Sequence, residues 1–473
     1  MTQFATEHPT ATKRLGLLFA AALAGALALI LFINGASLSE GGKANAGILP
    51  PCLPGDTAPP DALANNPNPS ETGPGDPKRK VIFVGNNWEG TADVVSTKGG
   101  QFETLTRINI VPDYDERVDE ICTNPVDLGY FLAIRELVGE GNDQLVDDMY
   151  STPDGKLLVV SRPSFRDVVA LHTAGPKTGE IKWRFQVAGQ RADHMAVSPD
   201  GKEVAISAST ANVVHLLDTK TGEETGQFAS GDSPHENTYS ADGSKIYHAS
   251  IGLVYTPGDE AVFDTDTNKG ERFFQVVDSK TGEIISRVDM GEKLEEAGYP
   301  DMSSAVRPMA ITGNERRAYL QVSFYHGVVT YNLRKERVKR ITDLPNLVPD
   351  VPREQYLLDS AHHGISLSGN DKRLCIAGTM SSYATVIGKR QLRKPSLEPR
   401  LIEAGEKPYW STTSENGKYC YVSWSGTDDI SIISFKTRKE IDHADVGEPA
   451  GNPAHPQRIR NGVVRQSFLD AND

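Results

Sequence analysis

The fold is decided by residues 193–207, DHMAVSPDGKEVAIS, and by residues 212–223, NVVHLLDTKTGE. A short apolar strand ends in the turn Ser198-Pro-Asp-Gly, and an alternating strand returns from it. A second strand, rich in β-branched residues, ends in Asp218-Thr-Lys-Thr-Gly, which indicates another hairpin turn before an edge strand. Four antiparallel strands joined by three tight connections form one blade of a β-propeller.

The same unit recurs along the chain, and such internal repetition is typical of propellers. The first turn is found again in full or degenerate form, at residues 151–156, 240–244, 312–316, 368–372 and 414–418. The later strand also recurs, from VVAL at 168–171 to ISIIS at 430–434. These matches predict six complete blades.

A seventh unit is split between the two ends of the repeat region. Residues 81–86 (VIFVGN) and 91–96 (TADVVS) supply a second and a third strand with no first strand before them. Residues 455–462 open a new unit near the C-terminus. A C-terminal strand that completes the first blade would close the ring and remove its open edges. The sequence therefore predicts an all-β, seven-bladed propeller over residues 79–467.

The repeat units resemble those of the YVTN-repeat propeller family. The resemblance rests on these motifs: Ser233-Pro-His, Ser198-Pro-Asp-Gly-Lys, Phe83-Val-Gly-Asn and Tyr421-Val-Ser. It covers about residues 79–465 and implies the propeller fold. The group is similar to surface-layer proteins, lactonases and amine-dehydrogenase subunits alike, so the resemblance does not select a function.

The N-terminal region predicts a membrane-associated or exported protein. Residues 15–33 (LGLLFAAALAGALALILFI) are long enough to span a bilayer, and Lys13 and Arg14 before them favour a cytoplasmic N-terminus at 1–14. Ala44-Asn45-Ala46 leaves a cleaved signal peptide as the alternative. We favour an uncleaved anchor, a Pro/Gly-rich tether at 34–78 and a propeller outside the cytoplasm, with a short tail at 468–473.

Charge and cysteine content narrow the possibilities further. The formal net charge is −14 and no Lys/Arg-rich stripe is evident outside short turns, so nucleic-acid binding is not expected. The four cysteines allow two disulfides in an exported protein, Cys52–Cys122 and Cys375–Cys420, with free thiols as the alternative. Cys375 and Cys420 lie in adjacent repeats, at positions where neighbouring blades face each other.

Three insertions lengthen the spacing between turns, at residues 108–146, 253–272 and 344–360. The first contains an apolar-periodic stretch from Leu128 to Leu137 that predicts a short helix. Insertions in a repeat array usually map to loops on one face, which is often the binding face. Neutral decoration remains the alternative.

The first strand of each blade lines the central channel, and this register position is rich in polar residues. Of the eleven histidines in the chain, five fall there. The ligand-binding candidates are Asp148, His194, His235, Glu236, Arg307, His362, His363, Lys407, His455 and Arg458. Imidazoles that converge from different blades suit a transition metal, for which the candidates are His194, His235, His362 and His363.

Two functions are compatible with these polar residues at the funnel-shaped mouth of the central channel. In the first, a membrane-anchored or exported propeller binds a small-molecule or protein ligand there, with Arg307, Lys407 and Arg458 as a possible clamp for an anion. In the second, the histidines hold a metal for an oxidoreductase or a lactonase-like hydrolase. Ordinary turn chemistry and a water-filled channel would explain the same residues without any ligand. The sequence carries no nucleophile elbow, P-loop or HExxH motif.

Overall fold

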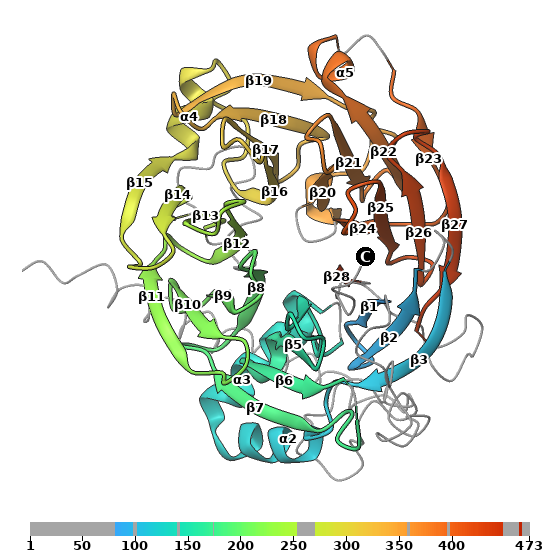
Figure 1. The fold of residues 1–473 in the computed structure, drawn as a ribbon. Coiled ribbons are helices and arrows are strands. Elements are labelled where there is room, and N and C mark those ends of the chain that lie inside the picture. Colours follow the sequence, from blue (N-terminus) through green and yellow to red (C-terminus); the bar gives the residue numbers. More distant parts are fainter. Residues whose placement is uncertain are drawn as a thin grey trace, which may run out of the picture.

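The computed structural model describes residues 81–97, 102–139, 142–173, 175–252, 270–356, 360–394, 398–447 and 463–465. These residues form seven four-stranded antiparallel sheets arranged as a ring (Figure 1). The chain therefore contains the seven-bladed β-propeller that its repeats predict.

Each blade runs from an innermost strand at the channel to an outermost strand at the rim. From the inside outward, blade one consists of β28 (Val463–Arg465), β1 (Val81–Asn86), β2 (Thr91–Ser96) and β3 (Glu103–Asn109), and blade two consists of β4 (Met149–Ser151), β5 (Leu157–Arg162), β6 (Asp167–His172) and β7 (Ile181–Gln186). Blade three consists of β8 (Ala192–Val197), β9 (Glu203–Ala208), β10 (Val213–Asp218) and β11 (Glu224–Ala229). Blade four consists of β12 (Pro234–Tyr239), β13 (Lys245–Ser250), β14 (Phe273–Asp278) and β15 (Ile284–Asp289). Blade five consists of β16 (Val306–Ile311), β17 (Arg317–Val322), β18 (Gly327–Asn332) and β19 (Arg337–Asp343). Blade six consists of β20 (Gly364–Leu367), β21 (Arg373–Gly378), β22 (Tyr383–Gly388) and β23 (Leu401–Ile402). Blade seven consists of β24 (Pro408–Thr413), β25 (Tyr419–Trp424), β26 (Asp429–Ser434) and β27 (Glu440–Asp445).

The ring closes through a C-terminal strand, as the split repeat predicts. The strand β28 pairs antiparallel with β1, with Val84 opposite Val464. The closing strand begins at Val463, just beyond the expected residues 455–462, which lie outside the described residues. The first blade thus joins the two ends of the propeller.

The same side-chain hydrogen bonds hold the first turn of six blades. Ser198 Oγ donates to Asp200 Oδ1 at 2.8 Å and accepts from the backbone N–H of Glu203 at 3.1 Å. The equivalent hydroxyls in the other five blades are Thr152, Ser240, Thr312, Ser368 and Ser414. Where the turn lacks its glycine, Glu315 and Asp371 take the left-handed conformation instead, with φ of 51° and 56°. The degenerate turns therefore keep the geometry of the regular ones.

Apolar side chains fill the space between neighbouring blades. One such cluster joins blades two and three through Val159, Val168, Val204 and Ile206, all with no exposed surface. A disulfide joins Cys375 on β21 to Cys420 on β25, with a Cα–Cα distance of 6.4 Å. The predicted bridge between adjacent blades is therefore present. Cys122 is also disulfide-bonded, and Cys52, its predicted partner, lies outside the described residues.

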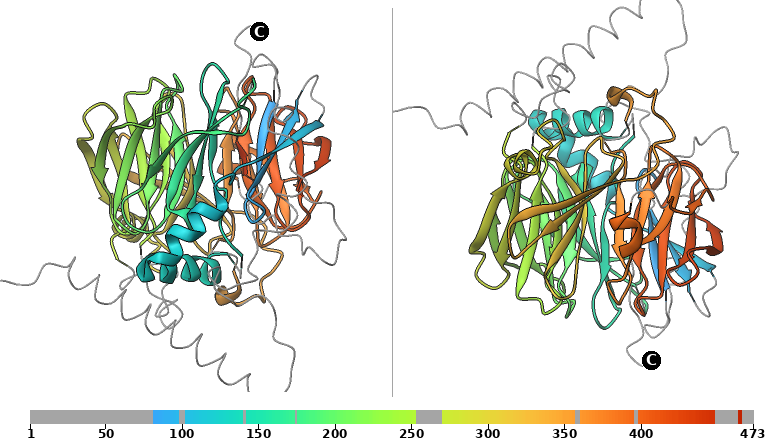
Figure 2. Two further views of the ribbon diagram at one scale, coloured as in Figure 1. Left: turned by 90° about the horizontal axis from the view of Figure 1, so that it is seen from below. Right: turned by 90° about the horizontal axis from the view of Figure 1, so that it is seen from above.

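The first insertion forms two helices, α2 (Tyr114–Thr123) and α3 (Pro125–Leu137). The helix predicted from the apolar stretch is α3, whereas α2 was not foreseen. In Figure 2 both helices lie on the same face of the ring as residues 344–356 of the third insertion. That insertion contains the 3₁₀ turn η5 (Arg353–Gln355), and residues 253–269 of the second insertion are not described. Short helices also follow β15, at α4 (Met290–Glu296), and β22, at α5 (Lys389–Arg393).

No helix among the described residues is both long and apolar enough to span a membrane. The predicted anchor at residues 15–33 lies outside the described part of the chain.

Candidate metal centre in the channel

Bulges interrupt the innermost strands at the position where the sequence places its polar residues. The pairing register shifts between Ala192 and Met195 in β8 and between Pro234 and Glu236 in β12. Equivalent shifts occur in β16 and β24. The residues that the ladders skip are Asp193, His194, His235, Arg307, Pro308 and Tyr409. A bulge leaves residues unpaired and re-aims their side chains, which here directs them into the channel.

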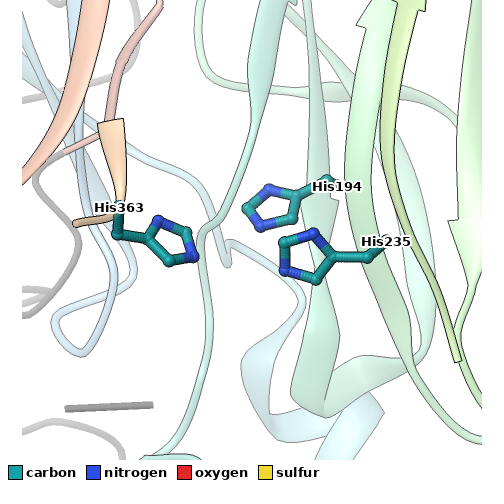
Figure 3. A group of neighbouring side chains, drawn as sticks. All are labelled: His194, His235 and His363. Carbon is teal, nitrogen blue, oxygen red and sulfur yellow. The ribbon is translucent and has the colours of Figure 1, made fainter. Parts of the chain in front are cut away.

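Three histidines from three blades converge at this level. His194 lies on β8 of blade three, His235 on β12 of blade four, and His363 directly before β20 of blade six. Each offers a ring nitrogen, and the three nitrogens lie within 4.8 Å of one another. Figure 3 shows the three rings pointing toward a common centre. The side chains are buried, with 5%, 3% and 1% of each residue exposed.

Aromatic rings from blade seven hold two of these imidazoles in place. Tyr409 stacks on His363 with ring centroids 4.0 Å apart and planes 16° apart. Trp410 stacks on His194 at 5.1 Å and 27°. Stacking on buried rings restricts the imidazoles to a few orientations, so the site is preformed on one side.

Carboxylates from blades two and three surround His194. Its Nδ1 lies 3.5 Å from Asp148 Oδ2 and 3.8 Å from Asp147 Oδ2. Asp148 Oδ2 also accepts a 2.8 Å hydrogen bond from the backbone N–H of Met195, which fixes it beside the histidine. Asp193 pairs with Arg191 and offers an oxygen within 4.8 Å of His194 and Asp147 ligand atoms.

These charges set the protonation of the site in the absence of a metal. Burial alone would lower the pKa of His194, but Asp147, Asp148 and Asp193 raise the pKa to about 10. Burial raises the pKa of Asp147 to about 6, against the pull of the His194 charge. The pKa of His235 lies well below its usual value because of burial and because His194, Arg307 and His363 are near. His235 is therefore neutral, the form in which imidazole binds metals, whereas an ion would have to displace a proton from His194.

The cationic side of the site is formed by Arg307, whose side chain is fully buried. Its Nε donates a 2.9 Å hydrogen bond to Ser323 Oγ, which holds the guanidinium against the channel wall. Glu236 follows His235 on β12 and is 7% exposed. Arg307 thus places a positive charge close to His235.

The structure separates His362 from the other three metal candidates. Its Nε2 lies 3.3 Å from the Tyr383 hydroxyl, and its ring is 5.5 Å from that of His326. His326 in turn hydrogen-bonds Tyr356 of the third insertion at 2.9 Å. Burial, together with His326, lowers the pKa of His362 to about 3. The four-histidine set expected from the sequence becomes a set of three in this geometry.

The remaining candidates do not join the cluster in the described residues. Lys407 is exposed and takes a left-handed conformation with φ of 47° before β24. His455 and Arg458 lie outside the described residues. Of the three cations expected to clamp an anion, only Arg307 is seen buried at the channel. Asp147, Asp193 and Tyr409, which the sequence places at the channel register, and Trp410, which it suggests as a channel-lining residue, also belong to the site, although they were not among the ligand-binding candidates.

No profile of a known protein family matches this chain. No curated protein matches it in sequence. Among solved structures, hydrazine synthase of Kuenenia stuttgartiensis is similar over 76% of this chain and 96% of that chain, with a TM-score of 0.52 and 14% sequence identity. At this identity the likeness shows a common fold and nothing about function. Membership of the YVTN-repeat family therefore stays a prediction.

Proposed function

We propose that the propeller binds a transition-metal ion in its channel and presents it to a ligand. His194, His235 and His363 would be the metal ligands. The observation that carries the proposal is the convergence of these buried imidazoles from three different blades. Imidazole suits zinc, copper, iron and nickel, so the ion would be one of these.

The spacing of the rings is compatible with coordination after a small movement. Nitrogens about 2.0–2.1 Å from a tetrahedral metal lie about 3.4 Å apart. Here the three nitrogens lie within 4.8 Å of one another. Rotation of the rings that moves each nitrogen inward by about 1 Å would bring all three to the distances of metal ligands. His235 Nδ1 is buried and has no hydrogen-bond partner among the described residues, so no hydrogen bond at this atom opposes the movement.

The carboxylates beside His194 support the proposal independently. Metal-binding histidines commonly donate their second ring nitrogen to a carboxylate, which fixes the tautomer and strengthens the metal bond. Nδ1 of His194 faces Asp148 and Asp147, which leaves Nε2 for the ion. Both carboxylates would also offset the charge of a divalent cation in this buried site.

A metal held by three protein nitrogens keeps at least one coordination position open. This is the arrangement of catalytic rather than structural zinc sites. It favours, as a second candidate, a metal-dependent oxidoreductase or hydrolase that works at the same centre. We further propose that the propeller operates outside the cytoplasm, on a membrane anchor at residues 15–33 or after export.

Metal analysis of the purified full-length chain tests the proposal. Protein dialysed against chelator and then titrated with zinc or copper should take up one ion per chain with high affinity. The His235→Ala variant should lose this stoichiometric binding. His172→Ala, altered at a half-buried histidine on β6 of blade two, is the control and should bind as the unaltered chain does. Equal uptake by His235→Ala and the unaltered chain would overturn the proposal.

A further inference from the structure

A second polar site lies on the outer part of blade five, away from the channel strands. Strands β17, β18 and β19 and the helix α5 form a pocket of about 370 Å³, its open mouth included. Eight residues line it: Arg317, Tyr319, Thr330, Lys339, Arg340, Lys389, Leu392 and Arg393. Five of the eight are cationic and none is acidic. In Figure 1, α5 lies beside the end of β19.

Strand pairing explains how these residues gather on one face. Tyr319 on β17 lies opposite Thr330 on β18, which in turn lies opposite Arg340 on β19. The three side chains therefore form a row across the blade. The register shifts next to this row, and Lys339 is the residue that the ladder skips. The bulge lets Lys339 and Arg340 reach the same pocket, although successive residues of a regular strand point to opposite faces.

The helix α5 closes the other side of the pocket. Arg340 Nη1 donates a 2.8 Å hydrogen bond to the carbonyl of Leu392, which anchors the helix to β19. Lys389 and Arg393 of α5 are exposed around the mouth. Their charges face the pocket from the side opposite the strands.

The cations in this pocket lie apart from the carboxylates of the described residues. Among the described residues, none of the five Lys and Arg side chains of the pocket is within ion-pair distance of an Asp or Glu. The pKa of Lys339 is lowered, mainly by the charge of Arg317 and then by burial. Three further arginines add to this shift, namely Arg340, Arg393 and Arg337, as expected where like charges crowd together. Such crowding is costly, and it stands out in a chain with a net charge of −14.

Two hydroxyl groups line the pocket beside the cations. Tyr319 is 2% exposed and Thr330 is 6% exposed, and both line the pocket. Among the described residues, neither hydroxyl has a hydrogen-bond partner. Because both residues line the open pocket and neither hydroxyl has a partner there, both can donate a hydrogen bond to an incoming anion.

We propose that this pocket binds an oxyanion group of the phosphate type. The guanidinium groups of Arg317 and Arg340 would provide paired donors to its oxygens, and the lysines would provide point charges. The hydroxyls of Tyr319 and Thr330 would complete its hydrogen bonds. The group could belong to a free phosphate compound or to the headgroup of an anionic lipid, because the recognised chemistry is the same.

Calorimetric titration of the full-length chain tests this site at constant ionic strength in chloride buffer. One arm uses inorganic phosphate, and the other uses short-chain dihexanoyl phosphatidylglycerol. Saturable binding in either arm is expected, and the arm in which it is tighter identifies the source. The variant Lys389→Gln/Arg393→Gln should bind at least tenfold more weakly than the unaltered chain.

The matched control is Lys220→Gln/Lys280→Gln, which removes the same charge from exposed turns of blades three and four. It should bind as the unaltered chain does, and so should His235→Ala, because the pocket does not depend on the channel histidines. Absence of saturable binding in both arms would overturn the proposal. Equal weakening in the two double variants would also overturn it, because only net charge would then matter.

Discussion

His362 and His363 are adjacent in the chain, yet their imidazoles belong to different clusters. His363 stacks on Tyr409 at 4.0 Å and converges with His194 and His235. His362 lies edge-on to His326 at 5.5 Å, beneath the insertion that contains Tyr356. One residue of register therefore separates a candidate metal ligand from a side chain that helps to pack an insertion.

Asp148 should control the affinity of the channel for metal without touching the ion. Its carboxylate lies 3.5 Å from His194 Nδ1. Replacing such a carboxylate typically costs about 10–100-fold in metal affinity. Asp148→Asn should therefore weaken zinc binding by about this factor, as measured by competition with a chromophoric chelator. Unchanged affinity in a variant of normal melting temperature would argue against the role of Asp148.

The bridge between blades six and seven should stabilise the fold. Cys375 and Cys420 are 45 residues apart in sequence, and closing a loop of this size lowers the entropy of the unfolded chain. The Cys375→Ser/Cys420→Ser variant should lose about 4 kcal/mol in its free energy of unfolding, as measured with urea. The same urea midpoint with and without the bridge would contradict this account.

His443 should make stability depend on pH in the alkaline range. Its Nε2 lies 3.4 Å from Asp429 and its Nδ1 lies 3.1 Å from Glu440. The hydrogen bond to Asp429 raises the pKa of His443 to about 9, burial opposes this shift, and Glu440 adds to it. Because the folded-state pKa exceeds the usual value of 6.5, the stabilisation is complete below pH 6.5 and disappears as the pH rises through about 9.

Melting temperatures of the unaltered chain and of His443→Gln check this prediction. The unaltered chain should melt higher at pH 6, and the difference should vanish near pH 10. Lys418→Gln, altered at an exposed position of the same blade, should show no such trend. A difference between the unaltered chain and His443→Gln that grows with pH would reverse the expected sign.

The proposed anchor predicts how the chain distributes in a cell. Alkaline phosphatase, which is active only outside the cytoplasm, should be active when fused after residue 78. Deletion of residues 15–33 should abolish this activity and move the fusion to the soluble cytoplasmic fraction. Full activity after the deletion would show that these residues do not direct export.

The blade count could be predicted because each blade is marked by local turn chemistry. The turn at Ser198 and Asp200 is held by hydrogen bonds between residues no more than five positions apart, and such local contacts can be predicted from sequence. The described closing strand, Val463–Arg465, lies just beyond residues 455–462, because a repeat in the sequence does not fix which residues pair. The helix α2 was missed although Tyr114, Val118 and Ile121 lie on one buried side of it.

The channel site could be predicted only as a register of polar residues. The sequence placed His194, His235 and His363 at that level, but their convergence depends on bulges and on the size of the ring. It also grouped His362 with them, since adjacent residues cannot be assigned to separate clusters without the blade geometry. The cationic pocket was not foreseen because its members come from four separate segments that only the folded blade brings together.

Metal binding by two neighbouring variants tests the central claim most directly. His363→Gln and His362→Gln alter adjacent buried histidines in the same way, and both should be purified with unchanged circular dichroism. We predict that the His363→Gln variant loses stoichiometric zinc or copper and that the His362→Gln variant retains one ion per chain. Retention of the ion by His363→Gln, or equal loss in both variants, would contradict a metal centre formed by His194, His235 and His363.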